Sequence, residues 1–279
     1  MALQTVRVRG AEVGYRRSGG RGRPVVLVHG NSSSSATWAP LLDGEFGERF
    51  ACVALDLPGH GGSAPPAAGA DDYAMPGYSA TIAEFADALG VRDAVFVGWS
   101  LGGNALVEAA PLLGADPAGY AVFGTPAVRD GASFAEAYLP DERMGMAFEE
   151  ELDAERAALY VSGFLAPGSA VPTGPLVAEA LATDPAARAG LARSVAEGRF
   201  ADETAVLKEL RQPIAVLHGA EERFVSLAYL RGLTVPTLWR GAVQVVPGAG
   251  HAVHLDRPDA LAALLGDFIA ELPQTGIRA

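Results

Sequence analysis

Short, uninterrupted runs of apolar residues recur along the chain and predict buried strands. Val25–Val28, Ala94–Val97 and Ile214–Leu217 are rich in β-branched residues, and each is followed by glycine or histidine. Continuous apolar runs are typical of parallel strands that helices cover on both faces. Three further runs of this kind are Cys52–Leu55, Tyr120–Phe123 and Val243–Val246.

Alternating and helical patterns lie before and between these runs. Thr5–Val8 and Val13–Arg17 alternate, which predicts an exposed antiparallel pair at the start of the chain. Stretches with helical character separate the apolar runs, and the clearest are Thr81–Leu89, Asn104–Leu113 and Pro258–Leu272. Strands that alternate with helices along the whole chain favour an α/β fold with one mostly parallel, doubly wound sheet.

One long segment interrupts this alternation. From about residue 128 to about residue 209 no strong strand pattern occurs, and Ala, Glu and Arg dominate with scattered Met, Phe and Tyr. We predict a helical lid insertion over 128–209, on a core domain formed by 1–127 and 210–279. Insertions at the carboxyl end of a strand are where α/β enzymes build lids, but the segment could instead be a packing appendage.

Composition and charge narrow the classes of function. The 279 residues include 21 Lys and Arg against 33 Asp and Glu, which gives a formal charge of −12. Because duplex binding needs cationic side chains, this balance argues against a nucleic-acid partner. Lys208 is the only lysine, so a phosphate loop of the GxxxxGK[ST] kind is excluded. Cys52 is the only cysteine, so no intrachain disulfide can form.

Targeting signals are equally sparse in the sequence. The first residues lack the apolar run of a signal peptide, and nowhere do about 18 consecutive apolar residues occur. We therefore expect a cytoplasmic protein without a membrane partner. The sequence makes no prediction of the oligomeric state.

The strongest chemical signal is the pattern GxSxG at residues 98–102. It lies directly after one predicted strand and directly before a helical run. A strand-to-helix turn that exposes a serine hydroxyl needs small residues on both sides, which Gly98 and Gly102 provide. The positive end of the following helix favours an oxyanion beside Ser100. We predict that Ser100 is a nucleophile; the alternative is a glycine-rich turn with an incidental serine.

A serine at its ordinary pKa is a poor nucleophile, so the site needs a base. His251 follows the last predicted strand in a glycine-containing loop, and we predict that it is the base, with His254 as its rival. The other three histidines, each at a strand end or in a glycine turn, are interpreted as local hydrogen-bonding groups: His29, His60 and His218.

An acid that orients the base should follow a strand at the same edge of the sheet. Glu221 and Glu222 both lie in the loop after Ile214–Leu217, and Asp130 is the positional alternative after the preceding strand. On position alone, either glutamate can hold the imidazole of the base.

An oxyanion hole needs two converging N–H donors. We expect the backbone of Leu101, the residue after the nucleophile, to supply one of them. The loop after Val25–Val28 is expected to supply the other through Asn31 or Ser32, because Gly30 permits the turn.

Several of these segments together resemble the α/β-hydrolase superfamily, namely VVLVHGNSSSSATW, DLPGHGGS, VGWSLGG and PGAGH. The order Ser100, Glu222, His251 is also the chain order of that superfamily. Its acid lies three residues after the glycine that ends a strand, usually as aspartate in HGxxD. Here Glu222 holds that position, so the resemblance implies Glu222 rather than Glu221 as the acid.

A narrower resemblance is to the N-acyl-homoserine lactone hydrolases of α/β-hydrolase type. It rests on HGNSSSSATWAPLL, GHGGS, DYAMPGYS, GWSLGGN, FGTPAV and AEERFV. That group also has glutamate at the Glu222 position, and Tyr160 falls where the group has a lid tyrosine facing the substrate. Asn104 stands where the resemblance leads us to expect histidine.

The resemblance implies hydrolysis of a neutral ester or lactone through an acyl-serine, with neither a metal nor an organic cofactor. The most specific reading is opening of an N-acyl-homoserine lactone, which is known as quorum quenching. We predict substrate contacts by Gly30, Trp99, Met144 and Tyr160. Apolar lid residues are candidates for an acyl-chain pocket or for plain helix packing, and they include Met144, Met146, Tyr160 and Phe164.

Three alternatives to a lactonase remain open on the sequence. A general carboxylesterase would use the same catalytic residues. A carbon–carbon bond hydrolase or a cofactor-free haloperoxidase would share the serine and the histidine. A small-molecule receptor on the same scaffold would bind its ligand with little turnover.

Overall fold

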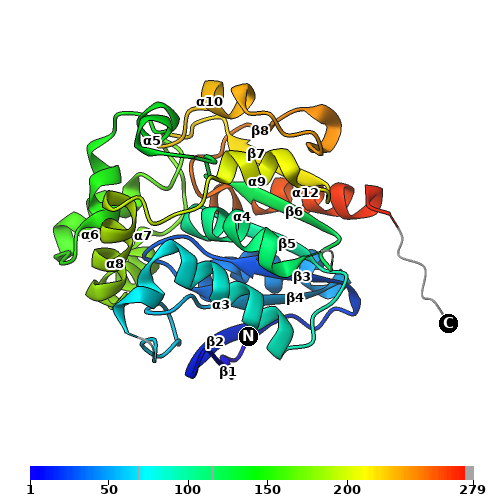
Figure 1. Ribbon diagram of the computed structural model, residues 1–279, viewed down its shortest axis with the longest axis horizontal. Coiled ribbons are helices and arrows are strands. Elements are labelled where there is room, and N and C mark those ends of the chain that lie inside the picture. The colour runs from blue at the N-terminus through cyan, green and yellow to red at the C-terminus, as the bar shows by residue number, and fades with distance from the viewer. Residues whose placement is uncertain (68, 115, 274–279) are drawn as a thin grey trace.

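The apolar runs form one eight-stranded sheet (Figure 1). The structure is a computed structural model that describes residues 1–67, 69–114 and 116–273. The strand order is β1-β2-β4-β3-β5-β6-β7-β8; β2 pairs antiparallel with β1 and β4, and the other neighbouring pairs are parallel. The strands are β1 (Gln4–Val8), β2 (Ala11–Arg17), β3 (Gly22–Val28), β4 (Phe50–Leu55), β5 (Val95–Trp99), β6 (Gly119–Phe123), β7 (Ile214–Gly219) and β8 (Gln244–Val246).

Burial of the strands follows the predicted pattern. Val25–Val28 in β3 are 0% exposed, and β5, β6 and β7 are buried along their whole length. Such burial needs helices on both faces of the sheet. β1, by contrast, is largely exposed at the sheet edge. The mostly parallel, doubly wound α/β fold and the antiparallel pair at the start of the chain are therefore confirmed.

Helices cover both faces of this sheet. Figure 1 shows α3 and α4 in front of the strands and α12 behind them. Among the described residues, none of the helices has both the length and the apolar character needed to cross a bilayer. The helices around the sheet are α1 (Ala39–Leu42), α2 (Glu45–Arg49), α3 (Met75–Ala88), α4 (Leu101–Leu113), α9 (Glu203–Glu209), α10 (Leu227–Gly232), α11 (Val253–Asp256) and α12 (Pro258–Glu271), with short 3-10 helices η1 (Ser35–Trp38), η2 (Ala70–Tyr73) and η4 (Trp239–Gly241).

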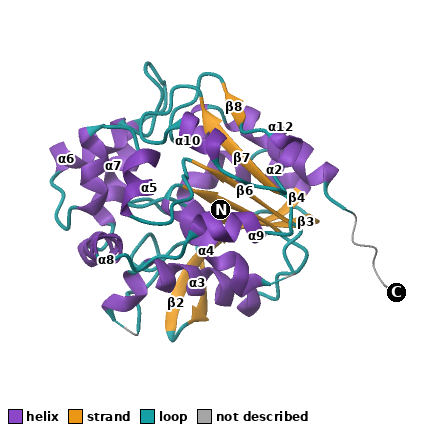
Figure 2. Ribbon diagram, turned by 45° about the horizontal axis from the view of Figure 1, so that its top comes forward, coloured by secondary structure: helices purple, strands orange, loops and turns teal. Residues whose placement is uncertain are grey.

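A helical cluster lies between β6 and β7 in the chain. Figure 2 shows α5, α6, α7 and α8 gathered beside one end of the sheet. Its elements are α5 (Gly131–Ala137), η3 (Glu142–Phe148), α6 (Ala154–Ser162), α7 (Thr173–Ala182) and α8 (Pro185–Ala196). The predicted insertion 128–209 also includes α9, but α9 packs against α4 over the sheet. The last helix of the predicted insertion, α9, therefore belongs by its packing to the helices that cover the sheet.

Aspartates begin most helices of this segment. Asp130, Asp141, Asp153, Asp184 and Asp202 each immediately precede a helix and accept a hydrogen bond from a first-turn backbone N–H. A carboxylate at this position satisfies an N–H that has no partner inside the helix, and it suits the positive end of the helix dipole. Part of the acidic excess in the composition thus serves to start helices.

One buried arginine ties the cluster together. Arg188 in α8 is 2% exposed, and its guanidinium donates to the backbone carbonyls of Glu149, Glu150 and Ala180 at 2.8, 2.9 and 3.1 Å. Because these carbonyls belong to the segment after η3 and to α7, a single side chain cross-links three parts of the insertion. Burial lowers the pKa of this guanidinium, although nearby acidic groups oppose the shift.

Candidate active site

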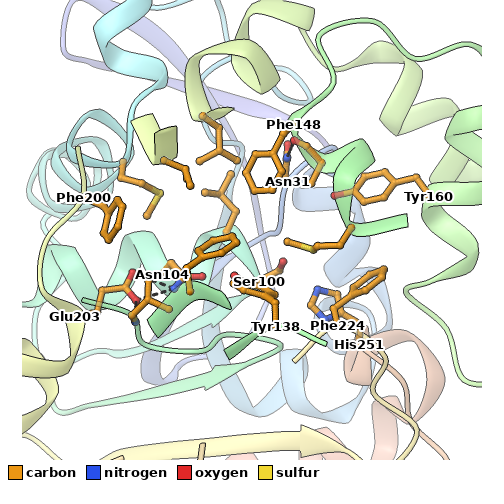
Figure 3. A pocket seen from close by; sticks show the side chains of 18 of the residues that line it. Asn31, Ser100, Asn104, Tyr138, Phe148, Tyr160, Phe200, Glu203, Phe224 and His251 are labelled. Carbon is orange, nitrogen blue, oxygen red and sulfur yellow. Dashed lines mark hydrogen bonds between the residues drawn. The ribbon is translucent and has the colours of Figure 1, made fainter. Parts of the chain in front are cut away.

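The predicted functional residues come together at the carboxyl edge of the parallel strands. Ser100 follows β5, Glu222 follows β7 and His251 follows β8, while Asn31 follows β3. Parallel strands end at the same edge of a sheet, so these loops converge although up to 220 residues separate them in the chain. Figure 3 shows Ser100, His251 and Asn31 around one cavity.

Ser100 occupies a strained turn between β5 and α4. Its backbone has φ 53° and ψ −124°, in the region that favours glycine. A Cβ on Gly102 would lie 2.3 Å from the His29 carbonyl oxygen, so this position tolerates no side chain. Strain at a serine between a strand and a helix is the geometry of a nucleophile elbow, which lifts the hydroxyl above the sheet.

His251 and Glu222 form a buried hydrogen-bonded pair. His251 Nδ1 lies 2.8 Å from Glu222 Oε2, and Glu222 Oε1 accepts from the Phe224 N–H at 2.8 Å. The side chains are only 3% and 1% exposed. Since a carboxylate can only accept, Nδ1 carries the ring proton and Nε2 is left as an acceptor. Gly124 permits the approach of the ring, because a Cβ there would lie 2.7 Å from His251 Cε1.

The surroundings keep Glu222 ionised. Burial by itself raises the pKa of the Glu222 carboxyl, but the imidazole of His251 and the hydrogen bonds from His251 and Phe224 outweigh burial and hold the pKa below its ordinary value. An ionised carboxylate at Nδ1 stabilises the positive charge that the imidazole acquires when it takes a proton.

The other acids considered from the sequence have different surroundings. Asp130 caps α5 through its hydrogen bond with the Ser133 N–H at 2.8 Å, and its side chain is 51% exposed. Glu221 has a buried carboxyl oxygen, Oε2, with no hydrogen-bond partner among the described residues. Of the three acids, Glu222 is the one whose carboxylate contacts His251.

The remaining histidines are held away from the cavity as buried neutral groups. His254, the rival base, contacts Thr37 Oγ1 through Nε2 at 2.7 Å, and burial lowers its pKa to about 3. His29 bonds to the Gly30 carbonyl, and His60 to the Pro58 carbonyl, as local groups. The prediction for His218 differs from the structure: its Nδ1 is buried without a partner in the described part of the chain.

Two backbone N–H groups beside Ser100 are candidates for the oxyanion hole. Leu101 and Asn31 both line the cavity, and neither backbone N–H donates to an acceptor within the described residues. The Asn31 side chain is occupied elsewhere, because Nδ2 donates to the Ala147 carbonyl at 2.7 Å. This bond joins the loop after β3 to the helical insertion. A positive φ of 57° at Ser32 shapes the same loop.

The cavity above Ser100 is largely apolar. It encloses about 640 Å³ of space not filled by atoms, part of which opens to solvent. Its polar lining consists of Asn31, Ser100, Asn104, Tyr138, Tyr160, Glu203 and His251. Its apolar lining consists of Met75, Leu101, Val128, Phe134, Met144, Ala147, Phe148, Phe164, Leu191, Val195, Phe200 and Phe224. Such a lining suits a neutral ligand with an apolar chain.

Some predicted substrate contacts lie outside this lining. Met144 and Tyr160 line the cavity, whereas Trp99, Gly30 and Met146 do not. Trp99 is 1% exposed, and its Nε1 donates to the His251 carbonyl at 3.0 Å, so it supports the histidine loop from behind. A Cβ on Gly30 would lie 3.0 Å from Ser100 Cβ, so this glycine makes room for the serine.

Sequence reasoning missed a polar pair in the cavity wall. Asn104 Nδ2 donates to both carboxyl oxygens of Glu203, at 3.0 and 2.9 Å, and the Val128 N–H donates to Glu203 Oε2 at 2.8 Å. Burial raises the pKa of Glu203 well above its ordinary value. The departure at Asn104 from the expected histidine was the one signal in the sequence that could have drawn attention to this pair.

Solved structures share this architecture. The structure of a variant of the N-acyl homoserine lactonase AidH in complex with N-hexanoyl homoserine lactone superposes with a TM-score of 0.91. The two sequences are 30% identical, and the match covers 96% of this chain and 97% of AidH.

Curated relatives point to the same fold family. A non-heme haloperoxidase from Rhodococcus erythropolis is 27% identical over 93% of this chain and 96% of its own length. The bifunctional biotin biosynthesis protein BioHC from Cellvibrio japonicus is 31% identical over 90% of this chain. The chain spans only 48% of BioHC, and 28% of an acetyltransferase component of an acetoin-cleaving system from Cupriavidus necator that is 38% identical over 109 residues.

A family model covers the parallel part of the sheet and the insertion. The model of the alpha/beta hydrolase family matches residues 25–264, which extend from within β3 to α12 and include every residue of the proposed catalytic site. The chain therefore belongs to the alpha/beta hydrolase family.

Proposed function

We propose that this hydrolase opens the ring of N-acyl-homoserine lactones through an acyl-serine intermediate. The observation that carries the proposal is that a strained Ser100 and the hydrogen-bonded pair of His251 and Glu222 come together at one apolar cavity. The similarity to AidH over 96% of the chain supports the lactone as substrate. A neutral lactone also suits the largely apolar lining of this cavity.

In the first half of the reaction, His251 Nε2 takes the proton of Ser100 while Oγ attacks the lactone carbonyl carbon. The carbonyl oxygen becomes an oxyanion, which the N–H groups of Leu101 and Asn31 stabilise. Glu222 stabilises the imidazolium. The ring C–O bond then breaks, and His251 gives its proton to the departing alkoxide, which stays attached to the acyl group as a hydroxyl.

In the second half, His251 takes a proton from a water molecule, and the hydroxide attacks the acyl-serine carbonyl. The bond to Ser100 Oγ breaks, and His251 returns the proton to the serine. The product is the open N-acyl-homoserine, a carboxylate. This product carries the same sign of charge as the acidic protein surface, which does not help to retain it.

We further propose that the helical insertion is the lid of this site. Much of the apolar cavity lining belongs to it, including Phe134, Met144, Phe148 and Phe164. Tyr160 extends from α6 into the same cavity, and burial raises the pKa of its hydroxyl, so the group stays protonated as a hydrogen-bond donor. The acyl chain of the substrate would lie among these side chains.

A comparison of two substrates distinguishes a lactonase from a general carboxylesterase. Purified protein is given N-hexanoyl-homoserine lactone, followed by proton release, and p-nitrophenyl hexanoate, followed by absorbance. The proposal predicts that kcat/KM for the lactone equals or exceeds that for the ester. Rapid ester turnover with an intact lactone would favour the carboxylesterase. That alternative is also supported by a curated relative of 28% identity, a pimeloyl-acyl carrier protein methyl ester esterase from Methylococcus capsulatus. Tight binding without turnover of either substrate would indicate a receptor.

A further inference from the structure

The cavity wall on one side of Ser100 carries polar groups that the proposed mechanism does not use. Asn104 lies one helical turn beyond Ser100 in α4, and its backbone N–H donates to the Ser100 carbonyl at 3.1 Å. Figure 3 shows the Asn104 side chain against Glu203, with Phe200 beside them. His251, Phe224 and Tyr160 lie on the other side of Ser100 in the same view (Figure 3).

Contacts of the Asn104 amide fix which of its polar atoms faces the cavity. Nδ2 donates to the Pro126 carbonyl at 2.9 Å as well as to the Glu203 carboxyl. A backbone carbonyl can only accept, so the atom facing Pro126 is the nitrogen whatever the protonation of Glu203. Oδ1 therefore points away from Pro126. It accepts no hydrogen bond from a described residue, and it is not among the polar atoms sealed inside the protein.

Glu203 holds this orientation from a rigid position. Its carboxyl is 1% exposed and accepts from the Val128 N–H at 2.8 Å, while its own N–H donates to the Val128 carbonyl at 3.0 Å. Two hydrogen bonds with the backbone of Val128 thus fix Glu203 in place. Glu203 acts on the cavity through Asn104 and is a positioning residue.

Chemistry defines how a lactone must lie over Ser100. The ring oxygen receives a proton from His251 as it leaves, so it lies on the His251 side of the carbonyl carbon. The α carbon is the other substituent of that carbonyl carbon, so it points away from His251. Figure 3 shows Asn104 on that side of Ser100. In an N-acyl-homoserine lactone, the α carbon carries the amide N–H.

We propose that Asn104 Oδ1 accepts a hydrogen bond from an N–H group on the α carbon of the substrate's acyl part, held in place by Glu203. The inference rests on the proposed serine hydrolysis but not on the lactone ring. Any ester with an N–H at this position is favoured over a matched ester without one, by about 10- to 100-fold in kcat/KM, because the unmatched substrate leaves the Asn104 carbonyl desolvated and unpaired.

A pair of methyl esters tests this directly. N-acetylglycine methyl ester and methyl 4-oxopentanoate differ only in N–H against CH2 next to the α carbon, and a pH-stat measures kcat/KM for both. We expect the ratio of the two values to be about 10- to 100-fold higher in the wild type than in Asn104→Leu. Intrinsic ester reactivities cancel in this comparison.

Two further variants keep the test decisive. Glu203→Gln preserves the volume of the side chain but replaces one carboxyl oxygen with an NH2 group that opposes Asn104 Nδ2. The Asn104 amide is then held less firmly, so the ratio should fall between those of the wild type and Asn104→Leu. Leu112→Ala, on the exposed end of α4, is the matched control and should keep the wild-type ratio.

The outcomes separate this inference from the proposed function. Equal ratios in the wild type and in folded Asn104→Leu would overturn the inference; if that variant does not fold, an unchanged ratio in Glu203→Gln overturns it instead. Wild-type turnover of these esters without opening of lactones contradicts the lactonase proposal alone. Turnover of neither ester contradicts serine hydrolysis, and the inference with it.

Discussion

Replacement of Glu222 by glutamine tests how the site sets the tautomer of His251. The carboxylate accepts two hydrogen bonds, from His251 Nδ1–H and from the Phe224 N–H, each at 2.8 Å. A glutamine has one carbonyl oxygen and can accept only one of them. If the oxygen stays with Phe224, the amide NH2 faces Nδ1 and forces the ring proton onto Nε2, the atom that must accept the serine proton.

The opposite amide orientation is also unfavourable. It places the NH2 group against the Phe224 N–H, and two donors that face each other in a buried site cost about 1–3 kcal/mol. The productive tautomer is disfavoured in either case. We expect kcat to fall by about 1,000- to 10,000-fold, which corresponds to about 4–5.5 kcal/mol of transition-state stabilisation.

Hydrolysis of p-nitrophenyl hexanoate measures this loss, with thermal unfolding by circular dichroism as the check on folding. Glu221→Gln is the matched control, because that side chain does not contact His251, and its kcat should stay within about twofold of the wild type. A folded Glu222→Gln variant within tenfold of wild-type activity would refute the reasoning. A larger loss in Glu221→Gln would assign the acid to the neighbouring residue.

Three further predictions concern backbone strain, packing and pH. Ser100→Gly should unfold at a higher temperature than Ser100→Ala, with about 1 kcal/mol more stability, because glycine accepts φ 53° without strain; equal melting temperatures would argue against a strained elbow. Gly102→Ala should lose about 2–4 kcal/mol of unfolding free energy in urea, because its new Cβ would lie 2.3 Å from a carbonyl oxygen. The control is Gly174→Ala in α7, whose Cβ would meet nothing within 4 Å and should not destabilise the protein. Similar losses in the two variants would contradict this reasoning. Burial raises the pKa of Glu108 from 4.5 to about 7, so the folded chain keeps a proton that the unfolded chain releases, and wild-type stability falls as pH rises between these values. The free energy of unfolding of Glu108→Gln, relative to that of the wild type, should rise by about 3 kcal/mol as the pH increases across that window. If the difference between the two proteins in urea unfolding does not change with pH, the pKa shift is excluded.

The sheet was predictable from the sequence because buried parallel strands have a distinctive pattern. Val25–Val28 and Tyr120–Phe123 are continuous apolar runs, and each lies in a central strand. The glycines around Ser100 were equally informative, since a side chain at Gly102 would collide with backbone. Steric requirements of this kind restrict which residue can occupy a position, so they are visible in the sequence.

The cavity wall was less predictable because its residues have no common local pattern. Phe200, Glu203 and Tyr138 lie in segments whose helices begin at aspartate caps, and nothing in their spacing shows which side chains face Ser100. Trp99 lies next to the nucleophile in sequence but supports His251 from behind the cavity. Contacts between distant segments, such as Asn104 with Glu203, depend on how the insertion packs on α4.

Lactone opening by the wild type and by Ser100→Ala tests the central claim most directly. Both proteins are incubated with N-hexanoyl-homoserine lactone in a pH-stat, and the open acid is verified by mass spectrometry against the spontaneous rate without protein. The account predicts ring opening by the wild type and only the spontaneous rate with folded Ser100→Ala. Ring opening by Ser100→Ala at the wild-type rate, or an intact lactone with the wild type, would contradict it.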